Sequence, residues 1–237
     1  MPEHGSALPL AWCLGAYFLL QVLLNLRLRG IARGNAAGRE RLLQAAAANG
    51  LINSLFFIAV SLWLMLAGHV PMPQLPQPLW AWLLGALPAG LLLWGLRMRL
   101  IGLGRRMFGG SAFVLPAEQL LRNPSDLGVI NRSVLQLSLF EPLGHELFFR
   151  GCVLALMLEI YGLGPALLAT AILELLLRLN PAWALSVLVG SLALSWMAQA
   201  GGGPLATICT AMVAGFLHAY VTAYQSMKTS GKQPEAG

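Results

Sequence analysis

Residues 140–151 read FEPLGHELFFRG and lie in the middle of a long apolar region of the chain. They place four ionisable side chains, Glu141, His145, Glu146 and Arg150, among residues that are otherwise apolar enough for the interior of a bilayer. A charged side chain at membrane depth costs at least about 2.5–3.5 kcal/mol, so such groups normally face the protein interior or a wet cavity. We therefore expect this segment to belong to a transmembrane helix and to contain functional residues.

The composition of the chain indicates a polytopic membrane protein. Of its 237 residues, 57% are hydrophobic and 10% are charged, against about 25% charged in a typical soluble domain; the mean hydropathy is +0.70. The net charge of +6 does not predict a nucleic-acid partner, because the basic residues lie in short segments between apolar runs. We expect one membrane domain over residues 1–237, ending in a polar, disordered tail at 226–237.

Seven apolar runs approach the length of about 20 residues that a membrane-spanning helix needs. The predicted all-α fold has spans at Ala7–Leu26, Asn49–Gly68, Leu79–Leu96, Val134–Leu158, Pro165–Asn180, Trp183–Gln199 and Pro204–Tyr224. Basic residues occur in connections 27–48 and 97–133 and in the C-terminal segment after the last span. No basic residue occurs in connections 69–78, 159–164 and 200–203. The positive-inside rule then predicts an N-terminus outside and a C-terminus in the cytoplasm.

Two connections carry further structural signals. Val70–Pro78 contains four prolines and predicts a stiff turn with no regular helix, because proline lacks the N–H donor. The segment Met107–Arg132 mixes prolines with apolar residues, and we expect it to lie along the cytoplasmic interface with a short helix at Pro116–Arg122.

The deep polar residues follow helical spacing. At 100° per residue, Glu141 and His145 share one face of a helix, and Glu146 and Arg150 share a neighbouring face, so each pair can form an i,i+4 contact. Glu174 and Arg178 repeat this spacing in the fifth predicted span, where an intrahelical ion pair is the simplest interpretation; His218 lies in the seventh. We expect these ionisable groups from three helices to meet at a common interior pocket.

The segment around Glu146 resembles the first motif, Glu-Glu-x-x-x-Arg, of the CAAX protease and bacteriocin-processing (CPBP, or Abi) family of intramembrane proteases. The resemblance covers residues 135–224, and the core it implies spans 134–224. Five positions match in order: Pro142, Glu146, Phe149, Arg150 and Gly151. The resemblance implies a location in a bacterial cytoplasmic membrane and catalytic roles for Glu146 and Arg150.

The chain departs from the family pattern at several positions. His145 replaces the first Glu of the first motif, while Glu174 and Arg178 stand where the second motif has Phe and His. In the third motif, the register from Gly203 places Met212 at the His position and Phe216 at the Asn position. His218, with Thr222 four residues later, is a possible shifted substitute.

These departures favour a non-catalytic pseudoprotease that binds another membrane protein or a lipid through the former substrate cavity. The first alternative is an atypical intramembrane peptidase that cleaves a membrane-anchored peptide with Glu146, Arg150, His145 and His218. The second is a proton-coupled transporter or channel that uses Glu141, His145 and Glu174. We expect no cofactor, and no metal site either, because His145-Glu146 begins like the zinc motif His-Glu-x-x-His but Phe149 occupies its last position.

Overall fold

A computed structural model describes residues 7–33, 38–73, 76–108, 119–121, 127–178 and 183–230. Within these ranges the protein is helical and has no β-strand, which confirms the predicted all-α class. Its separate helices are α1 (Ala7–Arg33), α2 (Gly38–Leu66), α3 (Leu79–Phe108), α8 (Leu163–Arg178), α9 (Ala184–Met197) and α10 (Gly203–Ser230). One continuous long helix is made of α5 (Leu127–Leu135), η1 (Gln136–Phe140), α6 (Glu141–Glu146), η2 (Leu147–Val153) and α7 (Leu154–Tyr161). The segments η1 and η2 are π-helical turns, whereas η4 (Ala198–Gly202), which precedes α10, contains a kink.

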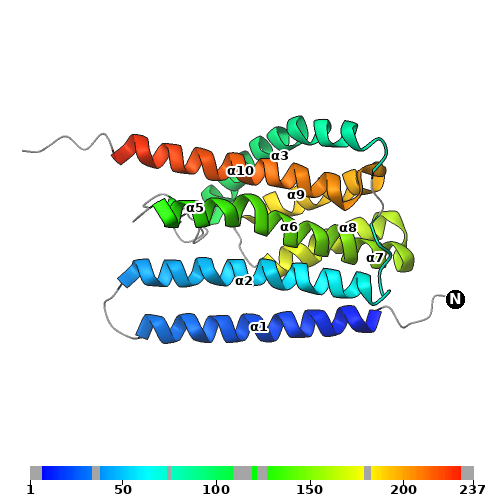
Figure 1. Ribbon diagram of the computed structural model, residues 1–237, viewed down its shortest axis with the longest axis horizontal. Helices are drawn as coiled ribbons and strands as arrows, with labels where there is room; N and C mark the ends of the chain where they lie inside the picture. The colour runs from blue at the N-terminus through cyan, green and yellow to red at the C-terminus, as the bar shows by residue number, and fades with distance from the viewer. Residues whose placement is uncertain are drawn as a thin grey trace, which may run out of the picture.

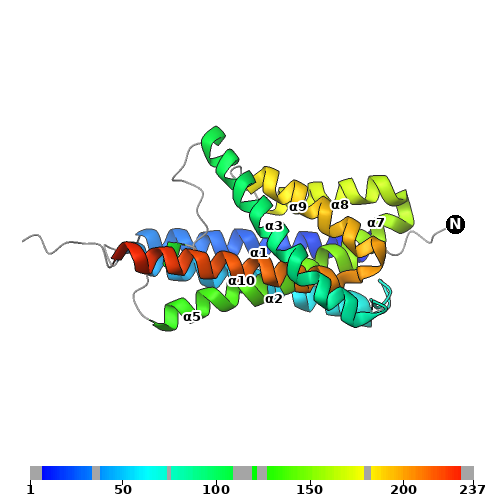
Figure 2. The same cartoon turned by 90° about the horizontal axis from the view of Figure 1, so that it is seen from above.

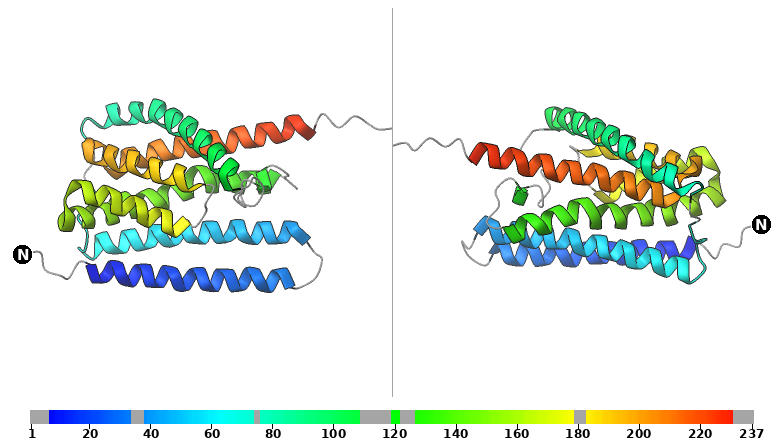
Figure 3. Two further views of the ribbon diagram at one scale, coloured as in Figure 1. Left: turned by 180° about the vertical axis from the view of Figure 1, so that it is seen from behind. Right: turned by 45° about the horizontal axis from the view of Figure 1, so that its top comes forward.

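The helices lie side by side in alternating directions (Figure 1). The helix Leu127–Tyr161 lies between α2 and α10, and α1 packs against α2 at the edge of the molecule. Helix α3 crosses α10 obliquely, as Figure 2 shows, and the two helices are in extensive contact. Helices α8 and α9 pack against each other, and α8 also packs against α7 (Figure 3).

Among the described residues, four helical stretches are long and apolar enough to cross a membrane: Leu8–Arg29, Arg41–Leu66, Leu79–Met107 and Ala184–Gln225. The last of these joins α9 and α10 across a kink at Gly201, whose φ of 105° reverses the chain. Large apolar side chains are open to the surroundings, with Trp12 72%, Phe18 72% and Leu92 75% exposed. Such extensive exposed apolar surface is unfavourable in water and suits a lipid environment. The fold is therefore that of an integral membrane protein.

Several helices continue beyond the predicted spans. Helix α3 runs on to Phe108 and α10 to Ser230, so the first residues of the predicted tail are helical. Hydropathy marks where a helix leaves the apolar layer, whereas Arg, Lys and Gln remain good helix formers beyond it.

Residues 71–73 and 76–78 contain no regular helix, as the prolines predict. Of the predicted helix Pro116–Arg122, only residues 119–121 are described, and they are helical.

Close contacts between helices depend on small residues and aromatic rings. A Cβ atom added at Gly144 of α6 would lie 2.6 Å from the Ser54 carbonyl oxygen of α2, so only glycine permits this approach. On the neighbouring α2 surface, the Phe57 ring stacks on Tyr17 at 4.9 Å and on Phe148 at 4.7 Å between ring centres. These contacts hold α1, α2 and η2 together and fix the face of α6 that turns towards the interior.

The π-helical turn before α6 has a local cause in Pro142. Proline has no N–H to donate, and its ring collides with the carbonyl group four residues earlier. The chain widens here, and the N–H of Glu141 donates to the carbonyl oxygen of Gln136, five residues back. Since π-helical turns change the rotation per residue, side chains beyond them no longer follow the 100° wheel.

Candidate functional site

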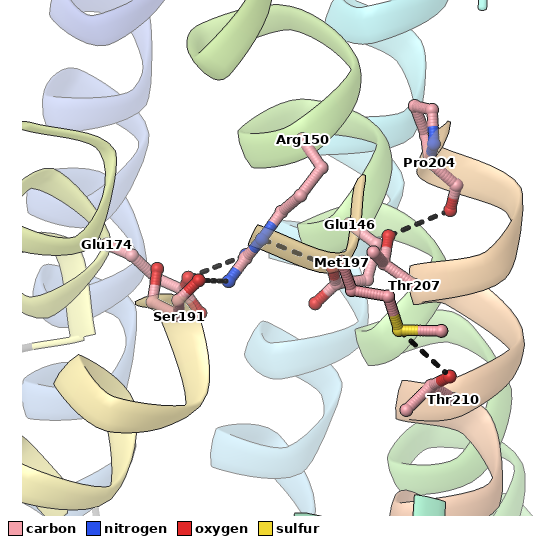
Figure 4. Close-up of polar contacts among 8 residues, drawn as sticks. All are labelled: Glu146, Arg150, Glu174, Ser191, Met197, Pro204, Thr207 and Thr210. Carbon is pink, nitrogen blue, oxygen red and sulfur yellow. Dashed lines mark hydrogen bonds and ion pairs between the residues drawn. The ribbon is translucent and has the colours of Figure 1, made fainter. Parts of the chain in front are cut away.

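Arg150 is the centre of a buried ion-pair network (Figure 4). Its Nη1 donates a hydrogen bond to Oε2 of Glu174 at 2.7 Å, and its Nε lies 3.3 Å from Oε2 of Glu146. Its Nη2 donates to the carbonyl oxygen of Ser191 at 3.2 Å. One guanidinium therefore joins its own helix to α8 and α9.

The network is almost completely shielded. Glu146 and Glu174 are each 2% exposed, and the Arg150 side chain is 0% exposed. Breaking a buried charge pair by removing one partner typically costs about 3–5 kcal/mol, because the other charge stays buried without compensation. These side chains consequently specify how α8 packs on the helix Leu127–Tyr161.

The sequence of α8 explains why Glu174 reaches Arg150. Ala166, Thr170 and Glu174 recur at four-residue spacing, lie on one face of α8 and are all buried. Small residues on a membrane helix allow close approach of a neighbour. The chain turns at Gly162, which has a φ of 74°, and so brings this face back against the helix it follows.

A polar cavity of about 50 Å³ lies beside the network. Its walls include Glu141, His145 and Glu146 of α6, Arg97 of α3 and His218 of α10. One water molecule needs about 10–15 Å³ of such space, whereas pockets for organic ligands measure about 300–1,000 Å³. The cavity therefore has room for a few water molecules and no room for a peptide segment.

Both imidazole rings that border the cavity pack on aromatic side chains. The His145 ring lies nearly parallel to Phe149, with 5.8 Å between ring centres, and 5.1 Å from Phe57. The His218 ring meets the Trp183 ring edge-on at 6.0 Å. These rings limit rotation of the imidazoles and keep each of them at the cavity wall.

The sequence prediction missed Arg97, which it assigned to a cytoplasmic connection. The continuation of α3 places Arg97 at the cavity with Trp94, Met98 and Ile101, all of which line it. A Cβ atom on Gly190 of α9 would lie 3.3 Å from Arg97 Nε, so this glycine leaves space for the arginine. These four cavity residues follow the i, i+3, i+4, i+7 spacing of one helix face, and this spacing is the sequence signal that could have identified Arg97 as facing the interior.

The predicted site residues fall into separate groups. Glu141, His145, Glu146 and His218 share the cavity, while Arg150 and Glu174 form the adjoining ion pair. Met212 lines a different, apolar groove of about 590 Å³ together with Leu87, Leu91 and Phe216. The side chain of Arg178 lies outside the described residues, as does its predicted pairing with Glu174.

The hydroxyl group of Thr222 donates to the carbonyl oxygen of His218 at 2.8 Å, a backbone contact within α10. In the described part of the chain, no group of three or more His, Cys, Asp or Glu side chains is arranged to hold a metal ion.

Comparisons with models of known protein families, with curated proteins and with solved structures gave no match to this chain.

Proposed function

We propose that the protein is a membrane-embedded pseudoprotease with a CAAX-protease-like core at residues 134–224, which binds a membrane-protein partner or a lipid without cleaving it. The observation that carries this proposal is the state of Arg150: its guanidinium is buried and bound to Glu146, Glu174 and the Ser191 carbonyl group. A hydrolase of this kind needs a base that activates water and a donor that stabilises the developing oxyanion. Here the donor is occupied by structural contacts.

The size of the cavity and the identity of residue 145 add support. At about 50 Å³, the cavity beside Glu146 has room for water alone. His145 occupies the position at which the resemblance implies a catalytic glutamate, and its ring is packed between Phe57 and Phe149. A partner or lipid would therefore bind the core outside this cavity, and the ion-pair network would maintain the shape of the core.

The proposal includes a topology. We infer seven spans in a bacterial cytoplasmic membrane, with the N-terminus outside and the C-terminus in the cytoplasm. The basic residues of the connections support this orientation. One of the shorter proposed spans is α8, of 16 residues, or about 24 Å at 1.5 Å per residue.

Native mass spectrometry of the purified protein in mild detergent tests the proposal. We expect a bound lipid or membrane protein that withstands purification and is retained by the His145→Ala variant. We also expect no cleavage of membrane-anchored peptides by the wild-type protein. Cleavage that disappears in His145→Ala, while the variant remains folded, would refute the non-catalytic assignment.

One observation favours a second candidate, a glutamate-dependent intramembrane peptidase. The same cavity is lined by Glu141, His145, Glu146 and His218. Two carboxylates and two imidazole rings are therefore close to any water held there, and each could act as a base. For this candidate, Glu146→Gln must abolish peptide cleavage, whereas Glu159→Gln on the exposed end of α7 must not affect it.

A further inference from the structure

Two cavities meet at the contact between Glu146 and Arg150. The smaller one, described above, has Glu146 in its wall. The larger one, of about 490 Å³, lies at the end of the bundle that contains the connection after α2, and Arg150 borders it together with Met72 and Pro204. Nε of Arg150 is 3.3 Å from Oε2 of Glu146, so a residue that borders the larger cavity is in contact with a residue that borders the smaller one.

Of the two carboxylates beside Arg150, Glu174 accepts a hydrogen bond from the guanidinium and Glu146 does not. The Arg150–Glu174 contact is a hydrogen bond of 2.7 Å. By contrast, Oε2 of Glu146 accepts no hydrogen bond from any described residue, although it lies near the guanidinium. Glu146 can therefore separate from Arg150 while Glu174 continues to compensate its charge.

Polar groups extend on both sides of this pair. Glu141 and His145 precede Glu146 on its own helix, and the charged or titratable groups that face this region from other helices are Arg97 of α3, Glu174 of α8 and His218 of α10. Within the described structure, the buried hydroxyl groups of Thr170, Ser191 and Ser195 also make no hydrogen bond to the protein. Buried hydroxyl groups of this kind are usually satisfied by ordered water.

We propose that Glu146 transfers protons between the two cavities, so that the protein conducts protons across the membrane. A proton from water in the larger cavity binds the Glu146 carboxylate, which loses its negative charge and leaves Arg150. The carboxyl group then releases this proton to His145 or to water in the smaller cavity, and the carboxylate returns to Arg150. Each cycle moves one proton from one side to the other, and a counter-ion balances the charge. This activity goes beyond the binding function proposed above.

Proton flux into proteoliposomes tests the inference. The purified protein is reconstituted into vesicles that contain a pH-sensitive dye, and a potassium gradient with valinomycin drives proton entry. We expect the wild-type protein and Glu159→Gln to conduct at least tenfold faster than empty vesicles, and Glu146→Gln to conduct no faster than empty vesicles. Wild-type flux equal to that of empty vesicles, or undiminished flux in Glu146→Gln, would overturn the proposal.

A second variant covers the case in which Glu146→Gln does not fold. Glu146→Gln removes the negative charge that lies beside Arg150 and shares the smaller cavity with Arg97. The double variant Glu146→Gln/Arg97→Gln removes one charge of each sign, so the net charge of the interior stays that of the wild type, and it should reconstitute as a folded protein. We expect flux at the level of empty vesicles from this variant; flux at the wild-type level would show that protons do not pass through Glu146.

Discussion

At Arg150, two carboxylates and one backbone carbonyl group from three parts of the chain surround one guanidinium group. The planar guanidinium can donate in several directions at once, which the single ammonium group of lysine cannot do with the same geometry. This residue therefore sets the relative positions of α8, α9 and the helix Leu127–Tyr161.

The Arg150→Lys variant tests this role at the level of one residue. The charge is kept, but lysine cannot reach Glu146, Glu174 and the Ser191 carbonyl group together, so at least one charged hydrogen bond is lost. We expect the free energy of unfolding to fall by about 1.5–3 kcal/mol, measured by titration with SDS in mixed micelles. The matched control is Arg99→Lys on the exposed surface of α3, with a change below about 0.5 kcal/mol. Equal effects in both variants would contradict the bridging role.

Local spacing predicts some of these contacts and not others. The Glu146–Arg150 contact was predicted from the i,i+4 spacing and is confirmed. The Arg150–Glu174 hydrogen bond joins residues 24 positions apart, and it depends on how two helices pack, which periodicity within one helix does not encode. Arg97 was missed for a different reason: hydropathy placed it outside the bilayer while its helix continued.

The helix Leu127–Tyr161 combines α-helical and π-helical turns, and α6 lies between two of the latter. The helical wheel predicted two separate faces for Glu141–His145 and for Glu146–Arg150. In the structure, Glu141, His145 and Glu146 line one cavity, while Arg150 borders another. Glu141, His145 and Glu146 all belong to α6, whereas Arg150 lies in the π-helical turn η2, which a wheel with a constant 100° step does not represent.

The contact between α6 and α2 provides a prediction at the level of helix packing. Gly144→Ala would place a methyl group 2.6 Å from the Ser54 carbonyl oxygen and force the two helices apart. We expect a loss of about 1–3 kcal/mol in the free energy of unfolding, typical of overpacking. Gly85→Ala on α3 is the control, since its added Cβ would have nothing within 4 Å and should be neutral or stabilising. A stable Gly144→Ala variant would contradict the close approach.

For the whole molecule, composition and hydropathy were sufficient to predict a helical membrane protein, and the described structure confirms this class. The arrangement of the helices was not predictable in the same way. Contacts such as Gly144 against Ser54 depend on single small residues, whose partner the sequence does not identify. The seven-span topology remains a prediction.

Labelling with a membrane-impermeant maleimide tests that topology. In a background in which Cys13, Cys152 and Cys209 are replaced, the His69→Cys variant should react in intact cells, because residue 69 is predicted to lie outside. Arg29→Cys should react only after the cells are lysed, because the basic connections are predicted to be cytoplasmic. The reverse labelling pattern would exclude the proposed orientation.

The most direct test of the buried network is a double-mutant cycle between Arg150 and Glu174. Arg150→Met and Glu174→Gln should each lower the free energy of unfolding by about 3–5 kcal/mol. The double variant should lose at least about 2 kcal/mol less than the sum of the two, because the charges are removed together. If the loss in the double variant equals the sum of the two single losses to within about 0.5 kcal/mol, as for distant sites, Arg150 does not bind Glu174 and the proposed interior is wrong.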